Sequence, residues 1–406
     1  MSINNACNIC SMETINDKFI LVQNKRICSK CVSTIVGGMT FANDFNDEIS
    51  SVPSVQPGVS TIEEQSFSKD AIMHPTEIKA RLDQYVVGQD QAKKVLSVGC
   101  YSHYKRCNMK DDEIKKSNIL LLGPTGSGKT YLVETLAKIM GVPLAICTAT
   151  TLTEAGYIGD DVESVVKRLL DVCDNDIEKA QRGIIFIDEV DKLVSSSTDT
   201  EKKVGGKGVQ QALLRLLEGS VVSVPLIKEP MRAGCVVDVD TSGILFICGG
   251  AFPEIETIVK RRINQANSIG FNSTIKVTME ENILNQVTNE DLIKFGLIPE
   301  FIGRLPVKAT LEALSVDTLK RILSEPKGSL LSQYKKLFNY DGIDLIFEDS
   351  ALERIAEKAI KLGTGARSLR AIMEECLLDL MFEMPAKGKE KQVIITSDFV
   401  DSKGAA

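Results

Sequence analysis

The feature that most constrains this chain is one glycine-rich run, Gly123-Pro124-Thr125-Gly126-Ser127-Gly128-Lys129-Thr130. It fits the pattern G-x4-G-K-[ST], follows an apolar run at 118–122 and precedes a helical pattern that begins at Tyr131. Glycines in such a loop let successive backbone N–H groups point at phosphate oxygens. We expect the loop and Tyr131 to bind ATP, with Lys129 near the β- and γ-phosphates and the Thr130 hydroxyl on Mg²⁺. The alternative, a glycine-rich turn without a ligand, is disfavoured by the flanking strand and helix.

An acidic pair, Asp188 and Glu189, ends the apolar run at 183–187. Carboxylates at the end of a buried strand are costly unless a cation meets them. We expect Asp188 to hold Mg²⁺, directly or through water, and Glu189 to orient and polarise the water that attacks the γ-phosphate. A kinase needs no such water activator, so the pair favours hydrolysis. An ordinary helix cap is the other interpretation.

Strongly apolar runs alternate with helical patterns through the middle of the chain. The runs at 118–122, 183–187 and 243–248 are continuous rather than alternating, as in strands that a parallel sheet buries on both faces. Residues 162–173 place apolar side chains at helical spacing. The pattern predicts an α/β fold built on a parallel sheet.

The 406 residues suggest about two to three domains at about 150 residues each. We expect a small zinc-binding domain at 1–42 and a linker rich in Ser, Asp, Glu and Pro at 43–72. A large ATPase domain would span 73–315. A small C-terminal domain would span 316–406, mostly helical with one late strand at 392–396.

Four of the eleven cysteines form two C-x2-C pairs with 17 residues between them: Cys7, Cys10, Cys28 and Cys31. This is the spacing of a structural Zn²⁺ site. Zinc would replace a hydrophobic core that roughly 40 residues can barely supply. A redox pair of dithiols is the alternative. The other cysteines are predicted to be small core residues: Cys100, Cys107, Cys147, Cys173, Cys235, Cys248 and Cys376.

Composition disfavours several classes of protein. The 43% of hydrophobic residues exclude a wholly disordered chain, and a net charge of −7 argues against a protein that coats DNA or an anionic membrane. No apolar run reaches the roughly 18 residues of a membrane span, and the N-terminus lacks the pattern of a signal peptide, so we expect a cytoplasmic protein. His74 and His103 lie near no serine motif or carboxylate pair, so both are predicted to be structural and the chain is not expected to cleave peptides itself.

Taken in this order, the motifs resemble the ClpX family of AAA+ unfoldases over nearly the whole chain. Besides the four cysteines, the phosphate loop and the acidic pair, the resemblance rests on five segments: 82–89 (LDQYVVGQ), 156–160 (GYIGD), 269–271 (IGF), 296–304 (GLIPEFIGR) and 365–367 (GAR). It implies an AAA+ P-loop ATPase domain, a small helical C-terminal domain and an N-terminal four-cysteine zinc domain.

The resemblance also implies roles around ATP. Val86 and Val87 would flank adenine. Arg304 would be the arginine finger that reaches the γ-phosphate bound by a neighbouring subunit, where its charge stabilises the transition state. Arg367 would contact phosphate from the small domain of its own chain, so that the nucleotide state changes the angle between domains.

Other implied roles concern partners. Tyr157 would stand in a pore loop, between Gly156 and Gly159, and grip an extended polypeptide. Ile269, Gly270 and Phe271 would dock on a ClpP-like peptidase, since an exposed Phe in a polar stretch suits a partner pocket.

The chain departs from the family pattern at two places. The second pore loop of the family commonly carries an Arg-Lys-His cluster, whereas 224–234 retains Lys228 and Arg232 and adds the opposing Glu229. At the sensor-1 position, the strand ends in Cys248-Gly249-Gly250, which offers no side-chain amide. Preference for tagged substrates is therefore open.

The predicted function is an ATP-dependent protein unfoldase, or chaperone, that forms a homo-oligomeric ring, expected to be a hexamer. It would thread unfolded or tagged proteins, some brought by adaptors, into a ClpP-like peptidase, with ATP, Mg²⁺ and Zn²⁺ bound and no membrane or nucleic-acid partner. A nucleic-acid remodelling ATPase is the alternative, disfavoured by the acidic balance and the lack of a basic, aromatic-studded groove. A regulatory module that binds ATP without hydrolysis is disfavoured by the presence of Lys129, Asp188, Glu189, Arg304 and Arg367.

Overall fold

The computed structural model describes residues 72–109, 113–153, 160–194, 202–225, 236–267, 283–387 and 392–403, and two short strands nearer the N-terminus. These strands, β1 (Phe19–Val22) and β2 (Lys25–Cys28), pair antiparallel. Cys7, Cys10, Cys31 and the side chain of Cys28 lie outside the described residues, as does 43–71. The zinc site and the linker stay predictions.

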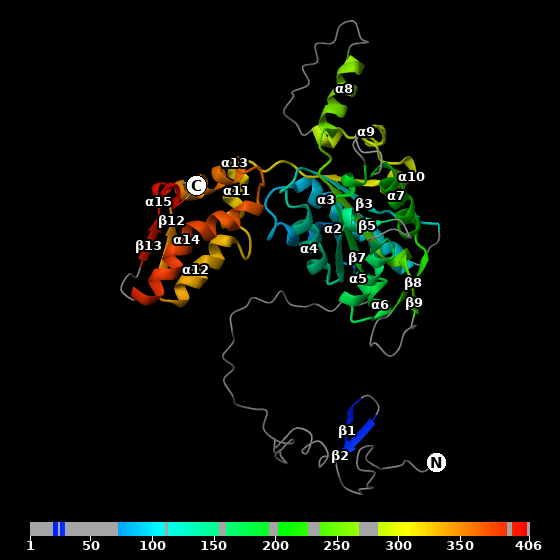
Figure 1. The fold of residues 1–406 in the computed structure, drawn as a ribbon, viewed down its shortest axis with the longest axis horizontal. Coiled ribbons are helices and arrows are strands. Elements are labelled where there is room, and N and C mark those ends of the chain that lie inside the picture. The colour runs from blue at the N-terminus through cyan, green and yellow to red at the C-terminus, as the bar shows by residue number, and fades with distance from the viewer. Residues whose placement is uncertain are drawn as a thin grey trace. The chain divides into compact units, whose positions relative to one another are not determined.

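A fully parallel five-stranded sheet forms the centre of the large domain, as the continuous apolar runs predicted (Figure 1). In spatial order its strands are β11 (Val307–Thr310), β3 (Ile119–Leu122), β10 (Leu245–Gly250), β7 (Ile184–Asp188) and β4 (Leu144–Thr148). The three predicted strands thus lie together in the middle. Strand β10 begins at Leu245 rather than at residue 243, because Thr241–Gly243 form a 3-10 turn.

The sequence reading missed the two edge strands, β4 and β11. An edge strand needs no continuous apolar run, since one side of it is open to solvent: Ile146 in β4 is 38% exposed, and β11 contains Lys308. It also missed two small sheets, the antiparallel β8 (Val221–Pro225) with β9 (Val236–Asp240) and the parallel β5 (Leu152–Thr153) with β6 (Asp160–Asp161).

Helices cover both faces of the sheet, so the large domain has three layers. In β3, Leu120 and Leu122 pack into one core cluster while Ile119 and Leu121 pack into the other, as alternation along a strand requires. The first core contains α5 (Ser164–Val172), α6 (Ile177–Ala180), α7 (Lys202–Glu218), α8 (Ile255–Asn267), α9 (Asn289–Phe295) and α10 (Pro299–Gly303). The second contains α2 (Pro75–Leu82), α3 (Asp90–Met109) and α4 (Lys129–Met140).

The small domain packs its helices around a separate core. Its helices are α11 (Val316–Ser324), α12 (Leu330–Tyr340), α13 (Asp349–Lys361), α14 (Arg367–Lys387) and α15 (Ser397–Lys403). The predicted late strand is β13 (Gln392–Ile395), and it pairs in parallel with β12 (Asp344–Phe347), a strand that the mostly helical prediction omitted.

Most of the isolated cysteines that the structure describes are buried, as predicted, and so is His103, whereas His74 is exposed before α2. Cys100, Cys147, Cys173, Cys248 and Cys376 are buried. Cys107 corrects the prediction: it is only partly buried, at the end of α3, with its Sγ 3.7 Å from Nε2 of His103. His103 is itself buried, with Nε2 2.9 Å from the carbonyl oxygen of Gly243. Cys235 lies outside the described residues.

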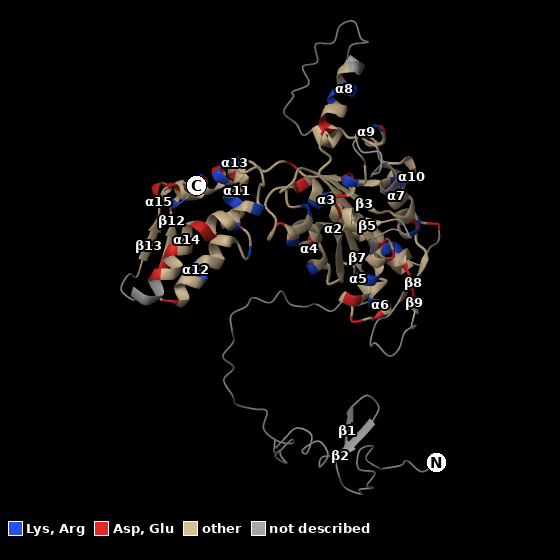
Figure 2. Cartoon of the chain, in the orientation of Figure 1, with Lys and Arg blue, Asp and Glu red and all other residues tan. Residues whose placement is uncertain are grey.

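Charge is distributed evenly over the described helices. Figure 2 shows Lys and Arg interspersed with Asp and Glu on the helices of both domains. Among the helices that the structure describes, none combines the length and apolarity that a membrane crossing needs.

One partly buried lysine lies at the base of the β8–β9 hairpin. Lys116 Nζ donates to the carbonyl oxygens of Thr241 at 2.8 Å and Leu216 at 3.3 Å, and lies 4.5 Å from the ring centre of Phe246. Burial, reinforced by Arg106, lowers the pKa of Lys116 from 10.5 to about 7. Between those two values the unfolded chain binds more protons at this residue than the folded chain does, so folding stability must rise with pH.

We predict that Lys116→Met removes this pH dependence. The free energy of unfolding of the wild type, minus that of the variant, should increase by about 1 kcal/mol or more between pH 7 and pH 10. Urea unfolding followed by circular dichroism measures the difference. The exposed neighbour Lys115→Met is the control and should show no such trend. A flat difference for Lys116→Met would contradict the lowered pKa of Lys116.

Candidate functional site

The glycine-rich run connects β3 to α4. Gly126 and Gly128 have φ of +77° and +94°, in the left-handed region that residues with a side chain rarely adopt. Gly128 is the N-cap of α4, so the helix begins at Lys129 and directs its first backbone N–H groups at the loop. The strand–loop–helix unit predicted from the sequence is therefore present, with the helix N-terminus at the place where an anion would bind.

Lys129 lies within this loop. Its Nζ donates to the carbonyl oxygens of Gly123 at 2.7 Å and Pro124 at 3.1 Å, and the residue is only 9% exposed. Burial lowers the pKa of Lys129, and the nearby carboxylates of Asp188 and Asp191 oppose that change. The Lys129 ammonium group therefore lies at the N-terminus of α4, near the carboxylates of Asp188 and Asp191.

Ser127 supplies an independent sign that the loop fits phosphate. Its hydroxyl oxygen is buried and has no hydrogen-bond partner among the described residues. An unsatisfied buried hydroxyl costs free energy that an acceptor in the loop would recover. Together with Lys129 and the N–H groups of α4, this donor set suits the phosphates of a nucleotide.

Thr130 and Asp188 meet across the site. Thr130 Oγ1 donates to Asp188 Oδ2 at 3.1 Å, from the start of α4 to the end of β7. Hydroxyl and carboxylate oxygens of this kind are the ligands that Mg²⁺ prefers. Glu189 follows with φ +60°, unusual for Glu, and its N–H donates to Asp188 Oδ1 at 2.9 Å. The strained turn therefore orients Asp188 and presents Glu189 beside it.

The structure explains why the strand between the loop and the acids ends in two glycines. A Cβ at Gly249 would lie 2.7 Å from the Phe186 ring and 3.3 Å from Asp188 Oδ1, and one at Gly250 would lie 2.7 Å from Asp191 Oδ1. The rings of Phe186 and Phe252, together with the two carboxylates, fill the space that a side chain at either position would take, since a Cβ at Gly250 would also lie 2.6 Å from the Phe252 ring. Asp191 itself is 4% exposed and accepts a hydrogen bond from the Ala251 N–H at 3.2 Å.

A pocket of about 490 Å³ lies next to the segment in which the sequence placed the adenine contacts. Val86, Val87 and Gly88 line it from the large domain, and Arg321 and 325–327 line it from the small domain. Its volume is in the range of ligand sites, and the two valines supply the apolar wall that a purine base needs.

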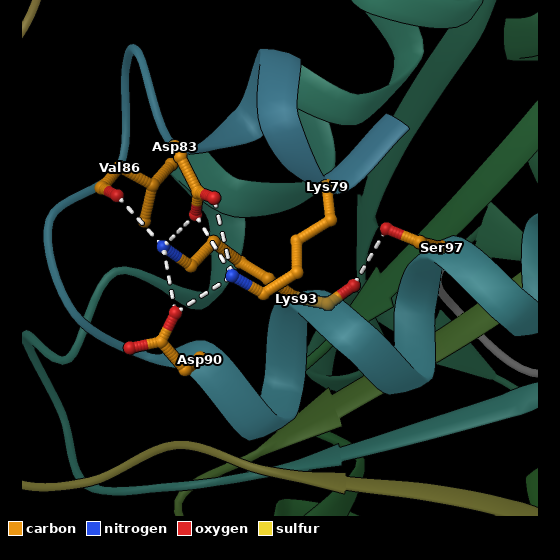
Figure 3. A network of polar contacts seen from close by, with 6 residues as sticks. All are labelled: Lys79, Asp83, Val86, Asp90, Lys93 and Ser97. Atoms are coloured by element: carbon orange, nitrogen blue, oxygen red, sulfur yellow. Dashed lines mark hydrogen bonds and ion pairs between the residues drawn. The ribbon is translucent and has the colours of Figure 1, made fainter. Parts of the chain in front are cut away.

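A buried lysine organises this wall (Figure 3). Lys93 is 3% exposed, and its Nζ contacts Asp83, Asp90 at 3.6 Å and the carbonyl oxygen of Val86 at 3.2 Å. The more exposed Lys79 bridges the same two acids, at 3.1 Å to Asp83 and 2.9 Å to Asp90. Burial alone would raise the pKa of Asp83, but its bonds to Lys93 and Lys79 lower it. The network fixes the backbone at Val86.

Gln89 joins the base pocket to the phosphate loop. Its φ is +56°, and its Nε2 donates to the carbonyl oxygens of Ser127 at 3.5 Å and Glu312 at 3.0 Å. Its Oε1 accepts from the Glu312 N–H at 2.8 Å. The amide therefore holds the base segment, the phosphate loop and the chain after β11 at fixed positions.

The small domain touches the phosphate loop directly. The Ala366 N–H donates to the carbonyl oxygen of Gly126 at 3.3 Å. Gly365, with φ +58°, allows this approach, since a Cβ there would lie 2.9 Å from the same oxygen. Arg367 begins α14 close enough to add to the effect of burial in lowering the pKa of Lys129. The residue predicted to sense phosphate from the small domain therefore lies beside the loop.

Arg304 lies at the opposite end of β3 from its own phosphate loop. Its carbonyl oxygen accepts a hydrogen bond from Asn118, the residue before β3, while the loop follows Leu122. Five steps along a strand separate Asn118 from Gly123, about 16 Å. The guanidinium pairs with Glu218 at 2.6 Å, and both side chains are nearly half exposed. Within one chain, Arg304 is not brought to the site formed by Lys129 and Asp188.

Several predicted residues remain untested. Tyr157, Ile269, Gly270, Phe271 and the second pore loop at 226–235 lie outside the described residues. Tyr131 is on the first turn of α4 with 48% of its surface exposed. The assigned roles of all these residues stay predictions.

Three contributors escaped the sequence analysis: the salt-bridged Lys93, the buried Asp191 and Asn118. Lys93 and Asn118 stand in ordinary helix and strand patterns, and no local motif marks their partners. Asp191 had a weak signal, since it follows the acidic pair by two residues.

We predict that Lys93→Met weakens ATP binding about tenfold, since the base wall loses the cation that holds Val86 and Asp83, while the hydrolysis rate at saturating ATP stays within about threefold. Calorimetric titration with ATP and a steady-state ATPase assay measure the two quantities. Lys79→Met is the matched control on the same acids and should weaken binding less than about threefold. Equal effects of both variants would contradict a special role of the buried lysine.

Comparison with known proteins agrees with this geometry. Residues 114–308 match the AAA domain (Cdc48 subfamily), and residues 314–396 match the C-terminal, D2-small domain, of ClpB protein. The chain is 49% identical over 337 residues to the "ATP-dependent Clp protease ATP-binding subunit ClpX" of Borrelia duttonii (strain Ly), which covers 80% of this chain and 78% of that protein. The match confirms the predicted AAA ATPase assignment and the resemblance, and the chain therefore belongs to the ClpX family.

Proposed function

We propose that the chain is an ATP-driven protein unfoldase that delivers substrates to a ClpP-like peptidase. The observation that carries the proposal is the contact of the small domain with the phosphate loop, from the Ala366 N–H to the Gly126 carbonyl oxygen. Because Arg367 follows directly, a change of charge in the loop acts on the small domain at short range. Hydrolysis would thereby change the angle between the two domains and produce movement.

In this proposal, the residues that bind ATP and Mg²⁺ and position the attacking water all come from one chain. Thr130 and Asp188 would hold Mg²⁺, which supplies positive charge to the phosphates when bound. Lys129 and the N–H groups of α4 would bind the phosphates, and Val86 and Val87 the base. Glu189 would accept a hydrogen bond from the attacking water and hold it in line with the γ-phosphate.

The stabilising arginine would come from a neighbour. Arg304 is about 16 Å along β3 from its own loop, yet it is exposed on the surface. A ring of identical subunits, which we expect to be a hexamer, would place each Arg304 at the next subunit's γ-phosphate. The active site is then incomplete in a single chain.

The remaining roles concern the substrate path. Tyr157 would grip the polypeptide in the pore, Ile269, Gly270 and Phe271 would dock on the peptidase, and the four-cysteine zinc domain would collect substrates or adaptors. The altered second pore loop, with Glu229 between Lys228 and Arg232, should change which tagged proteins enter. A cytoplasmic location fits these tasks.

We predict that two inactive variants restore each other in mixed rings. Lys129→Ala should abolish ATP binding, and Arg304→Ala should reduce hydrolysis about 100-fold or more because it removes transition-state charge. In mixtures, an Arg304→Ala subunit with an intact loop can use Arg304 of a Lys129→Ala neighbour. The ATPase rate of a mixture should exceed that of both pure variants. No recovery, with mixing shown by affinity co-purification, would place the arginine in its own chain.

We also predict that Tyr157→Ala uncouples hydrolysis from unfolding. The loss of fluorescence of a tagged, stable fluorescent protein, in the presence of a ClpP-like peptidase and ATP, should slow at least about tenfold, while ATPase falls less than about threefold. Wild-type chain that hydrolyses ATP but unfolds no protein with any tag would contradict the proposal. Stimulation of the ATPase by single-stranded DNA instead of unfolded protein would favour the nucleic-acid alternative.

A further inference from the structure

A buried amide stands at the end of β3 that lies opposite the phosphate loop. Asn118 is 1% exposed, and its Nδ2 donates two hydrogen bonds, to the carbonyl oxygens of Leu217 and Arg304, both at 3.0 Å. Both acceptors belong to helix ends. Leu217 is in the last turn of α7, and Arg304 is the C-cap of α10.

Helix ends explain why an amide suits this place. The last carbonyl groups of a helix have no partner within the helix, and one NH₂ group carries two protons, enough for two such ends. The orientation of the amide is set, because a flipped Asn118 would bring Oδ1 against two carbonyl oxygens. That Oδ1 has no partner among the described residues. The Asn118 amide thus holds the ends of α7 and α10 at the start of β3, while its Oδ1 stays without a hydrogen bond.

The side-chain contact of Arg304 is weaker. Its guanidinium pairs with Glu218 at 2.6 Å, but 48% and 45% of the two side chains are exposed. Ion pairs with this much solvent contribute little to holding a residue in place. Apart from the bond of its own N–H to the carbonyl oxygen of Phe301 at 3.1 Å, the buried amide is the contact that ties the Arg304 backbone to the start of β3.

We propose that Asn118 is the positioning residue of the arginine finger. It ties the backbone of Arg304 to the start of β3, the strand whose other end carries the phosphate loop, and so sets where the guanidinium projects from the subunit. The inference rests on the proposed role of Arg304 at the neighbour's ATP. Since a shift of about 1 Å in a group that meets the transition state can cost about 100-fold in rate, loss of the clamp should act on turnover more than on binding.

The test starts from full-length rings of Asn118→Ala. We expect kcat for ATP to fall at least tenfold, KM for ATP to stay within about threefold, and the ring mass by light scattering to be unchanged. Asn118→Leu, which keeps side-chain volume without donors, replaces the alanine variant if the latter does not assemble. Glu218→Gln is the control, with kcat expected within about threefold. If Glu218→Gln lowered kcat as much as Asn118→Ala does, the ion pair would be what positions Arg304, and the proposal would be overturned.

A double-mutant cycle separates positioning from general damage. If Asn118 acts through Arg304, Asn118→Ala should lower kcat in the wild type but add less than about twofold to Arg304→Ala. A further tenfold loss in the double variant would mean that Asn118 acts elsewhere, for example on its own phosphate loop through β3, and would overturn the proposal. Full ATPase activity of Arg304→Ala would refute the arginine-finger role of Arg304, and the inference about Asn118 with it. A normal kcat of Asn118→Ala, together with a strongly reduced kcat of Arg304→Ala, would refute only the inference about Asn118.

Discussion

The parallel pairing of β3 with both β10 and β11 is the constraint on which the rest of the molecule depends. Ile119, Leu120, Leu121 and Leu122 are all 0% exposed, and alternate side chains pack into two different cores. A strand held on both edges and both faces cannot shift along its axis without breaking a ladder and two cores. Its two ends are therefore at a fixed separation, with the phosphate loop at one end and the seat of Arg304 at the other.

In the proposed function, this geometry gives one subunit two different halves of a catalytic site. The carboxyl end of the sheet carries Lys129, Thr130, Asp188 and Glu189, which would bind the nucleotide and Mg²⁺ and orient the attacking water. The amino end carries Arg304, which its own loop cannot use because β3 keeps them apart. In the proposed ring, each β3 would connect one ATP site to the next through a rigid element, so that assembly and hydrolysis depend on each other.

The site also depends on glycines that let other chain segments come close to the backbone. Gly249 and Gly250 leave room for the carboxylates of Asp188 and Asp191, and Gly126 and Gly365 let two domains meet through a backbone hydrogen bond. At each of these positions, glycine is needed because it has no side chain that would block the close contact. The glycines at the predicted sensor-1 position, a departure from the family pattern, are explained by the Phe186 and Phe252 rings and by the carboxylates of Asp188 and Asp191, which leave no room for a side chain there.

Much of the fold and part of the site could be predicted from the sequence, because those parts depend on residues close together in the chain. The phosphate loop, its flanking strand and helix, and the acidic pair each lie within a dozen residues, so spacing alone identifies them. Edge strands such as β11, with Lys308, were missed, since half-exposed strands lack a continuous apolar run. The link between Lys93 and Val86 was missed because any helix surface can carry a lysine; only burial shows that this one is part of a wall.

The sequence by itself determined the α/β class, the nucleotide chemistry and the family, because motif residues act through local backbone geometry. Only the tertiary structure decided which groups share a site. It brought Arg367 and the Gly365 turn to the loop from more than two hundred residues away. It packed two phenylalanine rings and two carboxylates against Gly249 and Gly250, and it placed Arg304 at the end of β3 opposite its own phosphate loop. Such relations depend on strand order and on the distance between the ends of a sheet, and neither is encoded in any short stretch of residues.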